Sequence, residues 1–192
     1  LPMIERFKDE IGQEVSYKQC GYLLVATNEK DANAFRYNVK LQNKLGVSTQ
    51  LLSGDEVRAR LPLMKFDDAI VGTFNPKDGT VDPNSVVMGY ISAAQKMGVK
   101  TFTGAEVVGV SLRGDNVEEV QTTIGAIKTR MILNAAGPWA GQIGQMAGIN
   151  ISVIPLRRQM FTTSPLKEVP SDCPFVIDFA RSLYFHREGE GL

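Results

Sequence analysis

A mixed α/β fold is the fold class that the sequence predicts, and three observations predict it. Two amphipathic segments with helical periodicity, 28–45 and 82–97, each end at a glycine. Alternation with a period of two follows at 108–120, around a Gly-Asp-Asn turn typical of a hairpin. An apolar strand then enters a small-residue turn and a short helix over 127–147. We therefore expect a mixed, largely antiparallel sheet with helices packed on one side, plus a smaller additional layer.

Both long helices carry recognisable end signals. Asn28 can cap the first helix, and Asp82 can cap the second, where Pro83 suits the first turn. Gly46 and Gly98 follow the last apolar position of each helix, as is common at helix ends. The apolar face of the second helix consists of Val87, Tyr90, Ile91, Ala94 and Met97.

The strands are expected mainly in the second half of the chain. The hairpin would pair 108–112 with 117–120, and a strand apolar on both sides would end at Met131-Ile132-Leu133. Three further strand-like segments, connected through prolines, lie at 153–163, 175–179 and 183–187.

Composition excludes several classes of protein. Of the 192 residues, 43% are hydrophobic and 22% are charged, which is typical of a globular domain with a sizeable core. Lys plus Arg and Asp plus Glu both number 21, so the formal net charge is zero and nucleic acid is not an expected partner. The apolar runs are too short for a membrane span, and the N-terminal residues do not resemble a signal peptide.

The cysteines and the histidine argue against a metal site. Cys20 and Cys173 are the only cysteines, without CxxC spacing, and His186 is the only histidine, so we expect no zinc or iron. Two thiols so far apart in sequence favour a reducing compartment over a disulfide framework, which predicts a cytoplasmic protein.

The string Asn134-Ala135-Ala136-Gly137-Pro138-Trp139-Ala140 is the strongest local signal for a binding site. Three small residues after a buried strand let the backbone approach a flat or phosphorylated ligand. The alternative, which spacing alone favours, is a close helix-to-strand crossing that only requires small residues.

Taken with its flanking segments, this string resembles the flavin-contacting region of the D-amino-acid oxidase superfamily, the branch of sarcosine oxidase, glycine oxidase and dimethylglycine dehydrogenase. Similar segments occur in the same order at Gly79–Pro83, Glu106–Val110, Val153–Gln159 and Tyr184–Arg187. The resemblance extends over nearly the whole chain, from about Cys20 onward, and its ordered succession is more specific than any single motif.

The resemblance implies FAD as the cofactor. The backbone of Val107 would hydrogen-bond the adenine ring, and Ala135, Ala136, Gly137 and Trp139 would line the flavin. The family's strand followed by GxGxxG, which cradles the pyrophosphate, does not occur in this sequence. We therefore expect an internal fragment that binds FAD weakly or not at all by itself.

The resemblance also implies two interleaved domains. The substrate domain would comprise 1–104 and 149–192, and 105–148 would form a partial FAD/NAD(P)-binding layer. A partner subunit or a homodimer is a possible assembly, because excision exposes apolar surface.

The activity implied is oxidation of the C–N bond of an amino acid or N-methylated amine, such as sarcosine, glycine, dimethylglycine or proline, by hydride transfer to FAD. A basic residue is needed for the substrate carboxylate, and Arg158, beside Arg157, is a candidate. Tyr184 and His186 alternate on one strand and would face the substrate cavity. The alternatives are solvated arginines and a structural histidine on a sheet surface. No catalytic residue is assigned.

Two other functions are compatible with the same residues. One is a glycerol-3-phosphate dehydrogenase-like flavoprotein, which would need a basic phosphate site. The other is a non-catalytic binding or assembly module that uses an open sheet edge.

Overall fold

The computed structural model describes residues 2–192, and these fall into two compact units. We call residues 2–98 with 161–192 the β1 unit and residues 99–160 the β4 unit, and each is described by itself. The chain therefore leaves the first unit and returns to it. The assignment of the predicted segments 1–104, 105–148 and 149–192 to substrate and flavin domains stays a prediction.

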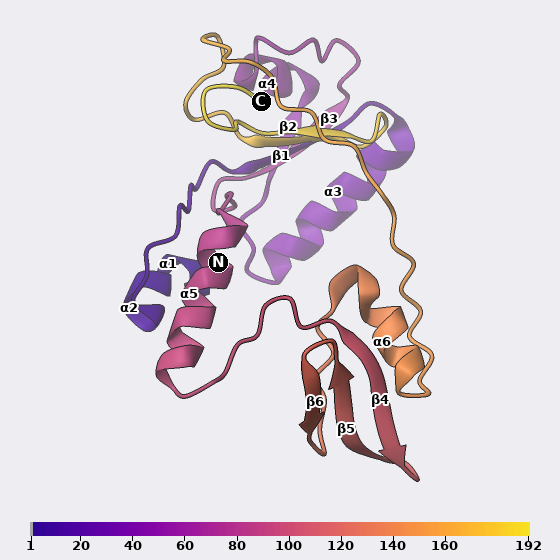
Figure 1. The fold of residues 1–192 in the computed structure, drawn as a ribbon. Coiled ribbons are helices and arrows are strands. Elements are labelled where there is room, and N and C mark those ends of the chain that lie inside the picture. Colours follow the sequence, from indigo (N-terminus) through magenta and orange to yellow (C-terminus); the bar gives the residue numbers. More distant parts are fainter. Residues whose placement is uncertain (1) are drawn as a thin grey trace. The chain divides into compact units, whose positions relative to one another are not determined.

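A mixed five-stranded sheet forms the centre of the β1 unit, in the order β2-β3-β1-β7-β8 (Figure 1). All neighbouring strands are antiparallel except β1 and β7, which are parallel although about 150 residues separate them. The strands are β1 (Tyr22–Ala26), β2 (Gln50–Ser53), β3 (Val71–Asn75), β7 (Phe175–Asp178) and β8 (Leu183–Phe185).

Two of the helices in this unit begin where the sequence predicts. Asn28 accepts a hydrogen bond from Asp31 N and caps α3, while Asp82 accepts from Asn84 N and Ser85 N and caps α5. A third helix, α4, begins with a capping box between Ser53 and Glu56. The helices are α1 (Pro2–Glu5), α2 (Phe7–Ile11), α3 (Glu29–Lys44), α4 (Gly54–Arg60) and α5 (Pro83–Lys96).

The core of the β1 unit lies on both faces of its sheet. Leu23, Val25 and Val176 are fully buried on one face, together with Val57 of α4. On the other face, Phe35 of α3 packs in a second cluster of buried residues. Helices therefore cover both faces, so the expectation of helices on one side only is wrong. Alternate residues of β1 are apolar on both faces, so each face needs cover.

The β4 unit consists of a three-stranded antiparallel sheet and a short helix. The predicted hairpin is confirmed as β4 (Val107–Arg113) and β5 (Asn116–Thr122), and β6 (Gly125–Lys128) extends the sheet. The 3₁₀ turn η1 (Gly137–Trp139) leads directly into α6 (Ala140–Met146), which packs against β4.

Two predicted strands do not form. Met131-Ile132-Leu133 and 153–163 lie outside every strand of the two sheets. Leu133 is 93% exposed, as expected for a strand sequence without a partner. Apolar pattern indicates that a segment suits a sheet, but hydrogen bonding requires a neighbouring strand.

Candidate functional site

The small-residue loop between Leu133 and α6 is held by one side chain. Asn134 Nδ2 donates a hydrogen bond to Ala140 O at 2.9 Å, and Asn134 Oδ1 accepts one from Ala136 N at 3.2 Å. Gly137 has a φ of 52°, in the left-handed region that favours glycine. Asn134 therefore fixes both ends of a tight turn.

The outer surface of this loop is open. A Cβ built on Gly137 would meet no atom within 4 Å, and Ala135 and Trp139 are exposed, with Ala136 partly buried. The predicted flavin-facing residues thus share one turn whose backbone a planar ring system can approach. These residues fit the cofactor that the sequence implies.

Val107 lies at the start of β4, in the same unit as the loop. It pairs with Thr122, and the register shifts before Gly109, which leaves Val108 as the extra residue of a β-bulge. The bulge takes backbone groups of Val108, rather than of Val107, out of the ladder, and a backbone contact of Val107 to a ligand stays a prediction.

The two arginines proposed for substrate carboxylate binding lie on the extended segment after α6. Arg157 and Arg158 are both exposed, and the strand expected to carry them is not formed. The structure does not gather them with the other candidate residues of the β4 unit.

Tyr184 and His186 are brought together in the β1 unit through a residue that sequence reasoning missed. Phe175 of β7 stacks on Tyr184, with ring centroids 5.8 Å apart, and on His186 at 5.1 Å. Tyr22 of β1 stacks on Phe175 at 4.5 Å. We call Tyr22, Phe175, Tyr184 and His186 the aromatic row, which crosses three neighbouring strands.

The electrostatic setting of the aromatic row combines burial with nearby acids. Burial, and then the Asp78 carboxylate, raise the pKa of Tyr22, and burial raises the pKa of Asp78 itself. At the other end, His186 Nδ1 lies 3.1 Å from Arg187 O and 3.9 Å from a Glu188 carboxylate oxygen. Aromatic faces beside carboxylates form a surface suited to a cation that carries apolar groups, such as a methylated ammonium group.

Arg187 does not serve as a free anion site. Its guanidinium donates hydrogen bonds to Gly189 O at 2.9 Å and Val169 O at 3.2 Å. It therefore holds the chain after β8 rather than offering its charge to a ligand.

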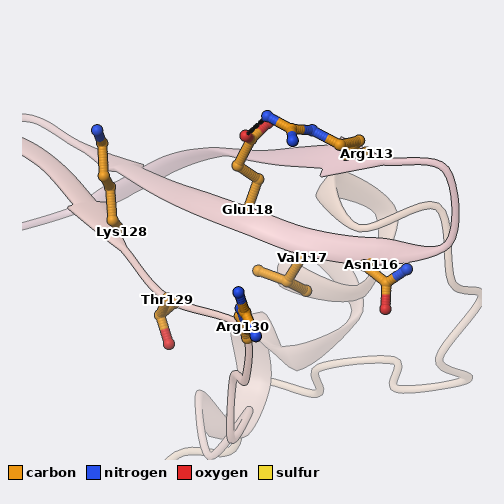
Figure 2. Close-up of a pocket in the computed structure, with 7 residues that line it drawn as sticks. All are labelled: Arg113, Asn116, Val117, Glu118, Lys128, Thr129 and Arg130. Atoms are coloured by element: carbon orange, nitrogen blue, oxygen red, sulfur yellow. Dashed lines mark hydrogen bonds and ion pairs between the residues drawn. The ribbon is translucent and has the colours of Figure 1, made fainter.

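A hollow of about 540 Å³ lies beside the β4–β5 hairpin rather than at the small-residue loop. Arg113 and Glu118 form an ion pair on one side of the strand, whereas Val117 and Arg130 lie on the other (Figure 2). Because the side chains do not converge, the hollow has no organised set of ligand contacts.

Residues 2–192 contain neither a cluster of metal-ligating side chains nor a membrane-spanning helix. No group of three or more His, Cys, Asp or Glu side chains is placed to hold a metal ion. No helix in this part of the chain is long and apolar enough to cross a membrane.

The fold of the chain is similar to that of a solved dehydrogenase. The crystal structure of L-proline dehydrogenase from P. horikoshii matches 99% of this chain and 51% of its own chain, with 28% identity and a TM-score of 0.81. The family model described as FAD dependent oxidoreductase matches residues 1–192. The chain belongs to this family.

Two mitochondrial dehydrogenases are among the relatives of this chain. Mitochondrial dimethylglycine dehydrogenase of Rattus norvegicus is 31% identical over 100% of this chain, which spans 23% of that protein. Mitochondrial sarcosine dehydrogenase of Mus musculus is 28% identical over 96% of this chain, which spans 21% of that protein. The chain therefore spans less than a quarter of the length of these relatives.

The expectation of a cytoplasmic protein is wrong. These relatives are mitochondrial proteins. The two cysteines indicated a reducing compartment, and that property does not separate the cytoplasm from a mitochondrial compartment.

Proposed function

We propose that this chain forms part of an FAD-dependent enzyme that oxidises the C–N bond of an amino acid or N-methylated amine. The observation that carries the proposal is the similarity to a dimethylglycine dehydrogenase over the full chain, at 31% identity. The open turn at Ala135–Gly137 and the aromatic row provide structural support.

The β4 unit would contribute the flavin contacts. Ala135, Ala136 and Gly137 present backbone without intervening side chains, and Asn134 keeps the turn rigid through its two hydrogen bonds. Val107 would offer a backbone group next to the bulge of β4. FAD, when bound, would accept the hydride from the carbon next to the substrate nitrogen.

The β1 unit would contribute substrate orientation. The faces of Tyr184 and His186 suit the methyl groups and partial positive charge of an N-methylated amine, and Phe175 fixes the planes of both rings by stacking. Arg158 is the proposed partner of the substrate carboxylate. The proposed location of the whole protein is mitochondrial, as for its relatives.

The test uses the full-length protein, purified and supplied with FAD, with dimethylglycine, sarcosine and proline added in turn without an electron acceptor. We expect bleaching of the visible flavin band by one of these substrates. A folded protein that takes up no flavin, or whose flavin no amine reduces, would refute the proposal and favour the non-catalytic module.

A matched pair of variants tests the carboxylate role. Arg158→Met should raise KM by roughly tenfold or more, since a lost charge-assisted hydrogen bond costs about 1.5–3 kcal/mol. Arg157→Met, equally exposed and adjacent, should leave KM unchanged. Equal effects of the two substitutions would remove Arg158 from the site.

A further inference from the structure

Two thiols that are far apart in the sequence lie on neighbouring segments of the β1 unit. Tyr22 and Phe175 are register partners in the parallel pair β1–β7. Cys20 precedes Tyr22 by two residues, and Cys173 precedes Phe175 by the same number. The cysteines therefore occupy equivalent positions on two neighbouring segments, just before each strand begins.

Hydrogen bonds join the two segments on both sides of the cysteines. Phe175 N donates to Gly21 O at 2.9 Å, immediately after them. Lys18 Nζ donates to Ser171 O, immediately before them. Neighbouring strands lie about 4.8 Å apart. A disulfide spans Cα separations of about 4.4–6.8 Å, so chains held at strand spacing can be bridged.

The two thiols differ in exposure. Cys173 is only 3% exposed and belongs to the core of the unit, whereas Cys20 is partly exposed. Burial, followed by the influence of the Cys20 thiol, raises the pKa of Cys173. A dissolved oxidant therefore reaches Cys20 first, while Cys173 lies buried on the neighbouring segment.

We propose that Cys20 and Cys173 form a peroxide-sensitive dithiol that closes into an intramolecular disulfide between the ends of β1 and β7. The Cys20 thiolate attacks a peroxide, whose O–O bond breaks, giving a sulfenic acid and hydroxide. The Cys173 sulfur then attacks the Cys20 sulfur. The hydroxyl group of the sulfenic acid takes up the Cys173 thiol proton and leaves as water. In total, two thiols and one hydrogen peroxide yield one disulfide and two waters.

The bond would have a specific structural consequence. It would join the two segments of the same chain two residues before Tyr22 and Phe175, the first two rings of the aromatic row. It would also close a long loop, and cross-links of long loops restrict the unfolded chain most. The proposal does not depend on the activity proposed above.

The experiment treats the folded full-length protein with hydrogen peroxide in stoichiometric amounts, blocks the remaining thiols, and maps peptides by mass spectrometry without reduction. We expect a cross-linked pair of peptides that contain Cys20 and Cys173, with both thiols lost together and both recovered after dithiothreitol. In Cys20→Ser, Cys173 should stay reduced under the same treatment.

Three results would overturn the proposal. One is oxidation of Cys20 to a sulfinic acid while Cys173 remains a free thiol. Another is a disulfide between two chains in place of the internal one. The third is unchanged loss of the Cys173 thiol in Cys20→Ser. Because Cys20 is partly exposed, this variant is expected to fold even if substitutions at buried Cys173 do not.

Discussion

The β1 unit has a hydrophobic core, and the β4 unit does not. Every buried hydrophobic side chain described in residues 2–192 lies in the β1 unit, including Leu23, Val25 and Val176. Within residues 99–160, large apolar side chains such as Met131 and Leu133 are largely exposed instead. Similar apolar content therefore leads to different packing in the two units.

The difference shows that a sheet needs cover on its faces to form a hydrophobic core. In the β1 unit, five strands are covered on one face by α4 with Val169 and Cys173, and on the other by α3. In the β4 unit, three strands have only α6 as cover. A small sheet with little cover leaves its apolar side chains exposed, as Met131 and Leu133 are.

Leu23→Ala should have the largest effect on stability among the substitutions that test this difference between the two units. Leu23 is fully buried in β1, so truncation should lower the free energy of unfolding by about 2–5 kcal/mol. The same change at exposed Leu133 should cost no more than about 0.5 kcal/mol. Urea unfolding followed by circular dichroism measures both values, and similar losses at the two sites would show that the β4 unit has a core.

Asp178→Ala should have the next largest effect. The Asp178 side chain is 3% exposed, and it accepts hydrogen bonds from the Arg181 guanidinium at 2.6 Å and from Arg181 N at 3.0 Å. The change removes both bonds and leaves Arg181 only its exposed ion pair with Asp68, so it should loosen the β7–β8 turn and cost about 1–3 kcal/mol. As control, Asp55→Ala removes an exposed ion pair with Arg58 and should cost about 0–1 kcal/mol. A larger loss in the control would contradict the role of burial.

Asp82→Asn should change the pH dependence of stability by a smaller amount. A hydrogen bond from Ser85 N holds the pKa of Asp82 below its ordinary value of 3.8. A lowered folded-state pKa stabilises the fold above pH 3.8, and this contribution is lost as the pH falls through the folded pKa. Asparagine also caps helices but does not titrate, so wild type and variant should converge in melting temperature on acidification. A constant difference between their thermal melts at all pH values would disprove the link.

Leu133→Ser should have almost no effect on stability but should reduce self-association of the isolated 192-residue chain. Leu133 is 93% exposed, and exposed apolar surface favours association. Light scattering at increasing protein concentration measures the change, with exposed Leu45→Ser in the β1 unit as the matched control. Equal effects of the two substitutions would show that association is not specific to the β4 unit.

Much of the fold was predictable from local signals. Asn28 and Asp82 marked the starts of α3 and α5, and the Gly114-Asp115 turn marked the β4–β5 hairpin. Such signals succeed because capping and tight turns involve residues close in sequence. The strand predicted at Met131–Leu133 failed because its apolar pattern requires a neighbour that the chain does not provide.

The candidate site also contains residues that local sequence predicts and residues that only distant strand pairing brings together. The turn around Gly137 was predictable because its small residues and its cap at Asn134 are contiguous. Tyr22 and Phe175 could not be recognised, since the parallel pairing of β1 with β7 joins residues about 150 positions apart. The same pairing brings the segments that carry Cys20 and Cys173 next to each other, although their separation in sequence favoured a reducing compartment over a disulfide framework.

The sequence by itself determined the fold class, the capped helices, the hairpin and the small-residue turn, because each depends on residues within a few positions of one another. Tertiary structure decided which apolar segments became strands, which side chains became buried, and which aromatic rings and thiols became neighbours. Those outcomes depend on strand pairing between distant segments, and pairing is selected by the packing of the whole β1 unit rather than by any local pattern.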